Sequence, residues 1–309
     1  MWCPHCGSPH KLGSRFCVAT GKPLDTRVHR NELPARRHPL VGTLIAGKYE
    51  VVRRIGAGGM GEVFEAENTV LGRIVAIKIV SGSGTEAAAR LRREAEVIAS
   101  LQHPNICDVY DVGALPDGSP FLVLERLTGE TLESHLRRER RIRPIRAIEL
   151  FTQILSGLQV AHAAGIVHRD LKPANVFLTE RIGCPPLVKI LDFGFAKDVS
   201  GRMRTMTQPG RRCGTPAYMS PEQLFGRPLD LRSDLFSVGI MLFEALSAQH
   251  PFAGASVTEM TVKIARDPTP ALPPRVSKEL AEIVRKALEK DPAARPKSAL
   301  EMQTALASL

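Results

Sequence analysis

Apolar and polar residues alternate in two ways along the chain, first with the period of strands and then with that of helices. Three runs rich in β-branched residues, separated by glycine and polar turns, predict strands at Tyr49–Arg54, Val63–Glu67 and Ile74–Val80. A threonine followed by helix formers, with apolar residues along one face, predicts a helix over Thr85–Gln102. Phe121–Leu124 is a further apolar strand. We therefore expect a small, strand-rich lobe with one main helix.

The pattern becomes mainly helical beyond this lobe. Between Ile148 and His162, apolar residues recur at three- and four-residue steps, which is the spacing of a helix with one buried face. Asp230–Leu246 and Lys278–Glu289 are further helix candidates, and no internal repeat is visible. The chain is thus expected to be an α+β protein whose larger, mainly α-helical lobe follows the strand-rich one.

Length and composition bound the class of protein. The 309 residues are 43% hydrophobic and 24% charged, which is typical of a globular chain and excludes a mostly disordered one. Such a length accommodates one large domain or two smaller ones. The N-terminus has no apolar signal core, and Leu150–Val167 contains too many polar residues to cross a membrane. We expect a cytoplasmic protein without a transmembrane segment.

Three of the six cysteines lie within the first twenty residues. Cys3 and Cys6, followed by a glycine, have the C-x-x-C-G form of a zinc knuckle, in which backbone amides turn toward sulfur. Cys17 resembles the start of the second knuckle of a short zinc ribbon. Such a ribbon needs four ligands, and Thr20, at the expected fourth place, is not a usual zinc donor.

A histidine is the candidate for the missing ligand, either His10 or His5. We predict a zinc-ribbon-like segment over residues 1–21, with Zn²⁺ on Cys3, Cys6, Cys17 and His10; a degenerate, disordered or redox-active tail is the alternative. Residues 22–48, rich in proline and charge, are expected to form a linker.

Glycines in the G-x-G-x-x-G spacing, at Gly56, Gly58 and Gly61, lie within the segment Ile55–Val63. Glycine lets backbone amides approach phosphate oxygens closely. A dinucleotide-binding fold requires a helix directly after these glycines, whereas Val63–Glu67 alternates like a strand. The loop is therefore expected to join two antiparallel strands and to fold over the phosphates of a nucleotide.

A lysine, Lys78, lies within the apolar strand predicted over Ile74–Val80, directly after Val75–Ile77. A lysine within an apolar strand is costly unless its ammonium group finds anionic partners. Nucleotide phosphates supply one partner, and Glu94 on the following helix supplies another; Glu96 lies two positions further round the helix and is less favoured. The alternative is a surface lysine at a strand edge.

A polar run, His168–Asn175, follows the predicted apolar helix. It places Asp170, Lys172 and Asn175 in one tight loop, and a second carboxylate, Asp192, follows the next predicted strand. Mg²⁺ is commonly held by a few protein oxygens together with substrate phosphates. Asn175 and Asp192 fit that requirement.

These motifs, in this order, resemble those of the eukaryotic-like serine/threonine protein kinases, including their bacterial members. The resemblance covers residues 49–306. It implies a bilobal protein-kinase-like fold, with an antiparallel-sheet N-lobe over about 49–125 and a helical C-lobe over about 128–306. It also implies ATP and Mg²⁺ as cofactors and protein Ser/Thr hydroxyls as substrates. The motifs are Gly56–Val63, Val75–Lys78, His168–Asn175, Asp192–Gly194 and Gly214–Glu222.

The resemblance assigns a role to each polar residue of these motifs. Asp170 would accept the proton of the substrate hydroxyl, Lys172 would contact the γ-phosphate, and Asn175 and Asp192 would bind Mg²⁺. Lys78 would hold the α- and β-phosphates. The residues implied around ATP are Ile55, Gly56, Ala57, Gly58, Gly59, Met60, Gly61, Glu62, Val63, Ala76, Lys78, Glu94, Leu124, Glu125, Leu127 and Phe177.

The adenine base would lie against Phe121–Leu127, which resembles the family's hinge strand. Leu124 would stand at the back, with the Glu125 carbonyl and the Leu127 amide facing the base. Glu130 is a candidate acceptor for the ribose or for a basic substrate residue. The roof and floor of the slot would be Val63, Ala76 and Phe177; ordinary core positions are the alternative.

Residues 192–222 would form the activation segment. Arg169 resembles the family's phosphate-binding arginine, and phosphorylation of a nearby threonine would create a group with which it can pair. Thr207 is the first candidate and Thr205 the second; the alternative is that both are exposed loop threonines. Lys172 and Thr215 are features of serine/threonine rather than tyrosine kinases.

Three further positions match the family's structural residues. Glu222 and Arg295 resemble its buried pair that anchors the activation segment, and Asp234 would cap the catalytic loop from a central helix. Phe236 stands where the family usually has tryptophan, and we expect this departure to affect packing rather than chemistry.

Two alternatives come from other classes of protein. A pseudokinase scaffold would lack a catalytic group, but none is missing. A basic adaptor that binds nucleic acid is suggested by the net charge of +10, yet the basic stretch Arg137–Arg143 has no interleaved aromatic residue on which bases could stack. We therefore predict an active enzyme that transfers phosphate to protein substrates. We also expect it to phosphorylate its own activation segment.

Overall fold

A computed structural model describes residues 38–58, 61–80, 85–181, 183–193 and 216–309. The chain divides into two compact units, residues 1–43 and 44–309. The described residues of the first unit form a turn, in which the Val41 N–H donates to the His38 carbonyl. The predicted zinc-ribbon-like segment lies outside the described residues. Within the part of the chain that is described, no helix is long and apolar enough to span a membrane.

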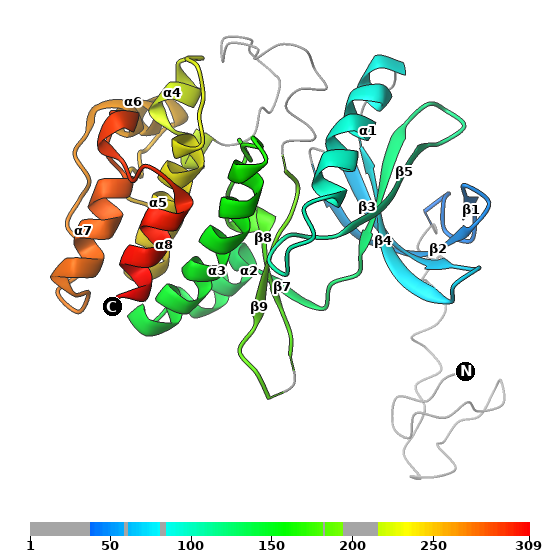
Figure 1. The fold of residues 1–309 in the computed structure, drawn as a ribbon, viewed down its shortest axis with the longest axis horizontal. Helices are drawn as coiled ribbons and strands as arrows, with labels where there is room; N and C mark the ends of the chain where they lie inside the picture. The colour runs from blue at the N-terminus through cyan, green and yellow to red at the C-terminus, as the bar shows by residue number, and fades with distance from the viewer. Residues whose placement is uncertain (1–37, 59–60, 81–84, 182, 194–215) are drawn as a thin grey trace, which may run out of the picture. The chain divides into compact units, whose positions relative to one another are not determined.

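An antiparallel sheet and one helix form the N-lobe of the second unit, drawn in blue to green (Figure 1). Its six strands are ordered β1-β2-β3-β4-β6-β5, and helix α1 contacts β5 and β6. The buried face of α1 carries Leu91, Ala95 and Ile98, as the sequence predicts. The elements are β1 (Leu44–Ile45), β2 (Tyr49–Gly58), β3 (Gly61–Asn68), β4 (Arg73–Val80), α1 (Thr85–Ala99), β5 (Val109–Ala114) and β6 (Pro120–Glu125).

The N-lobe sheet begins earlier than the sequence predicts. Leu44 and Ile45 pair with Glu50 and Tyr49 of β2, and Ile45 is buried. This end of the predicted linker therefore belongs to the sheet.

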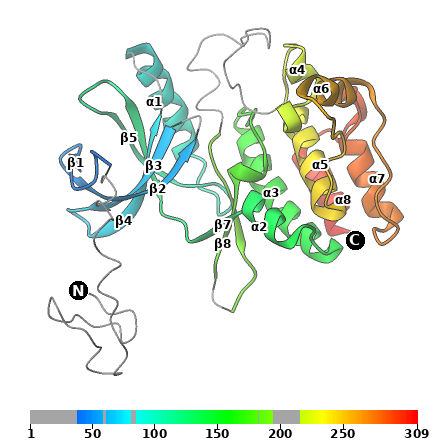
Figure 2. The same cartoon turned by 180° about the vertical axis from the view of Figure 1, so that it is seen from behind.

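The C-lobe combines helices with a small three-stranded sheet, as both views show (Figures 1 and 2). This sheet has the antiparallel order β7-β8-β9 and follows directly on the segment that joins the lobes. The bilobal α+β fold implied by the sequence is confirmed. The strands are β7 (Gly129–Thr131), β8 (Val176–Thr179) and β9 (Leu187–Ile190). The helices are α2 (Leu132–Glu139), α3 (Pro144–Ala163), α4 (Pro221–Leu224), α5 (Arg232–Ser247), α6 (Val257–Arg266), α7 (Lys278–Ala287) and α8 (Ala299–Ala307), with 3-10 turns at Pro173–Asn175, Pro216–Tyr218 and Pro292–Ala294.

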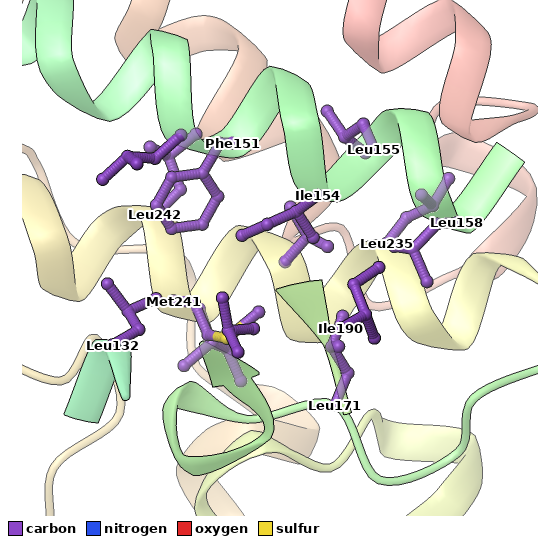
Figure 3. Packing of buried hydrophobic residues seen from close by; sticks show 14 of the residues in the cluster. Leu132, Phe151, Ile154, Leu155, Leu158, Leu171, Ile190, Leu235, Met241 and Leu242 are labelled. Carbon is purple, nitrogen blue, oxygen red and sulfur yellow. The ribbon is translucent and has the colours of Figure 1, made fainter. Parts of the chain in front are cut away.

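Helices α3 and α5 form the centre of the C-lobe core (Figure 3). Phe151, Ile154 and Leu158 of α3 face Leu235 and Leu242 of α5, and all five side chains are buried. Helix α5 is buried along almost its whole length, which is typical of a helix that is apolar on every side. It is therefore the element against which the other parts of the C-lobe are positioned.

A buried ion pair fixes helix α4 to this core. Arg295, 2% exposed, donates two hydrogen bonds to the Glu222 carboxylate, at 2.7 Å and 2.9 Å, and the Ser233 hydroxyl donates a third at 2.7 Å. The pair expected from the sequence is thus confirmed. Burial alone would raise the pKa of Glu222, but the bonds from Arg295 and Ser233 outweigh it and lower the pKa to about 2.

The Glu222→Gln variant should lower the free energy of unfolding by about 3 kcal/mol at neutral pH, because a buried charge pair that loses one partner leaves the other unpaired. The pKa of Glu222 is lower in the folded chain, so its contribution is complete above the unfolded value of 4.5 and is lost as the pH falls toward 2. Denaturant unfolding from pH 7 downward, while the chain still folds, should show a shrinking difference from wild type.

The matched control is Glu282→Gln, which removes an exposed carboxylate paired with Arg285. Since exposed ion pairs contribute at most about 1 kcal/mol, this variant should stay close to wild type. A difference between wild type and Glu222→Gln that stays constant with pH would contradict the ion-pair explanation.

Candidate active site

A cavity of about 450 Å³ lies between the two lobes. Its walls come from strands β2, β3 and β4, from the segment that joins the lobes, and from strand β8 and the end of β9. The predicted nucleotide residues in its lining are Ile55, Val63, Ala76, Lys78, Leu124, Glu125, Leu127 and Phe177. Aliphatic and aromatic side chains therefore face one another across a slot with one buried cation at its inner end.

The described glycines of the segment lie at the ends of two antiparallel strands. Gly58 of β2 pairs with Gly61 of β3, and β3 follows without a helix, as the sequence predicts. Gly61 has a φ of 137°, and a Cβ placed there would lie 1.9 Å from the carbonyl oxygen of Ile79. Only glycine fits this position. Gly56, Ala57, Gly58, Gly61 and Glu62 lie on the hairpin but outside the cavity lining, and Gly59 and Met60 lie outside the described residues.

The buried cation is Lys78, whose Nζ lies 2.6 Å from Asp192 Oδ2. This ion pair joins strand β4 of the N-lobe to Asp192, which lies two residues after the end of β9 in the C-lobe. Glu94 lies on α1, but its side chain is outside the part of the chain that is described, so its predicted contact with Lys78 stays a prediction. Glu96 is exposed and pairs with Arg92, so the sequence argument against Glu96 is confirmed.

The loop after α3 brings three predicted residues into contact. Asp170 Oδ2 accepts hydrogen bonds from Lys172 Nζ at 2.8 Å and from Asn175 Nδ2 at 3.2 Å. Asn175 Nδ2 also donates to the Asp170 carbonyl at 2.8 Å. Because the amide nitrogen of Asn175 faces Asp170, its amide oxygen faces the opposite way.

Two hydrogen bonds tie this loop to the strand that precedes Asp192. The Leu191 N–H donates to the Asn175 carbonyl at 2.8 Å, and the His168 ring contacts the Leu191 carbonyl at 2.8 Å. Asp192 itself has a left-handed backbone, with a φ of 57°. Lys78, Asp170, Asn175 and Asp192 are thus held in one connected network, of which Lys78 and Asp192 line the cavity.

Asp234, at the start of α5, fixes the beginning of the loop. Its side chain is 1% exposed and accepts from the backbone N–H groups of His168 at 2.8 Å and Arg169 at 3.0 Å, and it contacts His162 Nε2 at 2.8 Å. The expected capping contact is confirmed. Arg169 has a φ of 63°, a conformation that a residue with a Cβ seldom adopts without such support.

Comparison with protein-family models identifies the family of the chain. Residues 49–306 match the model described as the protein kinase domain. The chain belongs to this family.

Three bacterial relatives of this chain are named as serine/threonine-protein kinases. The chain is 40% identical over 269 residues to serine/threonine-protein kinase pkn3 of Myxococcus xanthus, covering 84% of this chain and 49% of the relative. It is 42% identical to a probable serine/threonine-protein kinase of Streptomyces coelicolor, covering 84% and 39%, and 38% identical to PknA of Mycobacterium tuberculosis, covering 88% and 63%. The chain therefore spans between two fifths and two thirds of the length of these relatives.

Sequence reasoning missed an ion pair behind the segment that joins the lobes, the predicted hinge. Lys189 Nζ lies 2.6 Å from Glu125 Oε1 and 3.1 Å from the Ile106 carbonyl, and Lys189 is buried. Glu125 Oε1 also accepts from the Asp108 N–H at 2.8 Å. Lys189 lies in an apolar strand, so the signal that drew attention to Lys78 applies equally to it. The pair ties the hinge to the strand that leads to Asp192.

A second network holds the outer side of the hinge. Glu65 of β3 accepts from Arg126 at 2.7 Å and from Arg53 at 2.8 Å. Burial would raise the pKa of Glu65, but the bonds from the two arginines lower it overall. The segment joining the lobes is therefore attached to the N-lobe sheet as well as to β9.

Glu130, in strand β7 of the C-lobe, has ion-pair and hydrogen-bond partners within the chain. Its carboxylate pairs with Arg138 at 2.5 Å and contacts His135 at 2.9 Å, and the Arg138 bond is the main reason that the pKa of Glu130 is lowered. The predicted contact with a ribose or a basic substrate residue would have to compete with these partners.

The remaining predicted residues are only partly described. Arg169 is exposed, but Thr205 and Thr207 lie outside the described residues, as do Cys3, Cys6, Cys17 and His10. Across the described residues, no group of three or more histidine, cysteine, aspartate or glutamate side chains is arranged to hold a metal ion.

Proposed function

We propose that the chain transfers the γ-phosphate of ATP to serine and threonine hydroxyls of proteins. The observation that carries this proposal is the connected network of Lys78, Asp170, Asn175 and Asp192, of which Lys78 and Asp192 line an interlobe cavity. Phosphoryl transfer depends on alignment and charge neutralisation more than on a strong base. Two fixed carboxylates and two cations beside an apolar slot meet both requirements. The names of the relatives support the serine/threonine class.

Asp170 would accept the proton of the substrate hydroxyl. The bond from Asn175 fixes one side of its carboxylate, and Lys172 lies 2.8 Å from the same oxygen. Lys172 is then placed to contact both Asp170 and the transferred phosphoryl group. Lys78 would hold the α- and β-phosphates from the opposite lobe, with Glu94 as its predicted second partner.

Asn175 and Asp192 would hold Mg²⁺, which when bound neutralises and orients the phosphates. The donor set fits this ion, because Mg²⁺ prefers oxygen ligands and takes several of them from water and phosphate. Asn175 commits its amide nitrogen to Asp170, which leaves its amide oxygen for the metal.

We also propose the division of the chain that the sequence predicts: a zinc-ribbon-like segment over residues 1–21, a linker over 22–48 and the kinase domain over 49–306. The described residues modify it only at residues 44 and 45, which join the sheet.

Asp170→Asn should reduce phosphate transfer by about 10²–10⁴-fold, because the amide cannot accept the substrate proton. The measurement is transfer of labelled phosphate from Mg-ATP to a generic protein substrate. Asp117→Asn is the matched control, since Asp117 is an exposed carboxylate in the β5–β6 turn that accepts from the Ser119 N–H. Equal transfer by wild type and Asp170→Asn would contradict the proposed mechanism.

The kinase should phosphorylate its own activation segment at Thr207 or, second, at Thr205, because the added charge can pair with Arg169. After incubation with Mg-ATP, phosphopeptide mapping should find phosphate within residues 198–214 of wild type and none there in Asp170→Asn. Thr207→Ala should remove most of it. A wild-type segment without phosphate would refute this part of the proposal.

The N-terminal segment should bind about one zinc ion per chain through Cys3, Cys6, Cys17 and His10. Metal analysis of purified protein should find zinc in wild type and much less in Cys3→Ser, because a structural zinc site rarely survives the loss of a thiolate. Cys184→Ser is the control, as Cys184 is exposed in the C-lobe. Equally negligible zinc content in wild type and Cys3→Ser would refute the proposed zinc site.

A further inference from the structure

Both the oxygen and the nitrogen of the Gln223 side-chain amide, on the short helix α4, form hydrogen bonds. Its oxygen, Oε1, accepts from the Ser220 N–H at 2.9 Å and from the Ser220 hydroxyl at 3.2 Å. The Gln223 N–H donates in return to Ser220 Oγ at 3.4 Å, which completes a capping box. These bonds direct the amide oxygen toward Ser220 and leave the amide nitrogen on the other side.

The amide nitrogen reaches the catalytic loop, where Gln223 Nε2 donates to the carbonyl of Arg169 at 2.8 Å. This carbonyl belongs to the peptide bond that leads into Asp170. The N–H of the same peptide bond donates to the His168 carbonyl at 2.8 Å. Both polar groups of the Arg169–Asp170 peptide are therefore held.

Two contacts hold the backbone at Arg169 from either side. Asp234 Oδ1 accepts from the Arg169 N–H at 3.0 Å, and Gln223 binds the Arg169 carbonyl from another element. Between these contacts the backbone has a φ of 63°. The orientation of the next residue, Asp170, depends on both sides of this unusual turn being held.

Gln223 is itself attached to a rigid part of the C-lobe. It follows Glu222, whose buried pair with Arg295 fixes α4 against the core. The contact thus relates the catalytic loop to the anchored end of the activation segment.

We propose that Gln223 is a positioning residue for Asp170, acting through the peptide bond between Arg169 and Asp170. This inference rests on the proposed function, because the orientation of Asp170 matters for catalysis only if Asp170 accepts the substrate proton. Gln223 does not itself touch the reacting groups. A small misplacement of a catalytic group is enough to slow a reaction whose rate depends on alignment.

One substitution separates this role from helix capping. In Gln223→Glu the carboxylate still accepts from the Ser220 N–H, as glutamate commonly does at this position of a capping box. It presents an oxygen instead of an N–H group to the Arg169 carbonyl, so the bond to the loop is lost. Gln223→Met is a second variant, uncharged and of similar size, that has no donor.

Loss of one such hydrogen bond should lower kcat for phosphate transfer by about ten-fold in both variants, while the KM for ATP stays within about two-fold of wild type. The melting temperature of Gln223→Glu should stay near that of wild type, since its cap is retained. Gln303→Glu is the matched control: Gln303 Nε2 donates to the Thr152 carbonyl at 3.2 Å, between α8 and α3. That variant should keep the wild-type kcat.

The outcomes distinguish this inference from the proposed function. A wild type that transfers no more phosphate than Asp170→Asn refutes the proposed function, and this inference with it. An active wild type whose kcat is matched by Gln223→Met and Gln223→Glu refutes the inference alone. So does a loss of kcat in Gln303→Glu as large as that in Gln223→Glu, because the effect would then not be specific to the loop.

Discussion

The candidate site depends on one buried carboxylate, that of Asp234. An ionised group that is 1% exposed is costly unless hydrogen bonds replace its water. Asp234 obtains them from two consecutive backbone N–H groups, those of His168 and Arg169, and from the ring of His162. Because two of the donors belong to the main chain, the carboxylate fixes the path of the loop itself. It also stabilises the left-handed turn at Arg169, which costs about 1–2 kcal/mol for a residue with a Cβ.

Helix α5 connects this constraint to the rest of the C-lobe. The helix that carries Asp234 also carries Ser233, which donates to Glu222, and the Arg232 carbonyl, which accepts from Arg295. Its apolar residues form the centre of the core. The loop at His168–Asn175 and helix α4 are thus positioned by one buried helix. Since a densely packed core resists small displacements, neither can shift without disturbing that packing.

The sequence predicted the helices and strands in which apolar residues recur periodically. It also predicted charged residues whose burial costs free energy unless they have partners. Strands β1 and β7, of two and three residues, are too short to give a periodic signal. In β5 the pattern is interrupted by Gly113, where a Cβ would lie 2.5 Å from the Phe121 ring. Lys78 was found because a charge within an apolar run needs a partner, and the other motif residues were found through the family resemblance. Which partner a buried charge meets is decided by tertiary contacts. Lys78 meets Asp192 across the lobes, and Lys189 meets Glu125, although their sequence environments are alike.

Phe236 stands where the family usually has tryptophan, and both an aromatic ring and two cations surround it. Its ring lies parallel to that of Phe252, with centroids 6.3 Å apart, and the Lys290 ammonium lies 3.7 Å from the Phe252 centroid and 5.6 Å from that of Phe236. Among the described residues Lys290 Nζ has no hydrogen-bond partner, and burial lowers its pKa to about 8. The ring faces attract this desolvated cation, together with the carboxylates of Asp267 and Glu289. Arg295, stacked 4.8 Å from the Phe236 centroid, already has the carboxylate of Glu222, so the phenyl rings accommodate the second positive charge of this region. Phe236 therefore lies against both cations beside the ion pair of Glu222 and Arg295, and its expected effect on packing rather than chemistry stays a prediction.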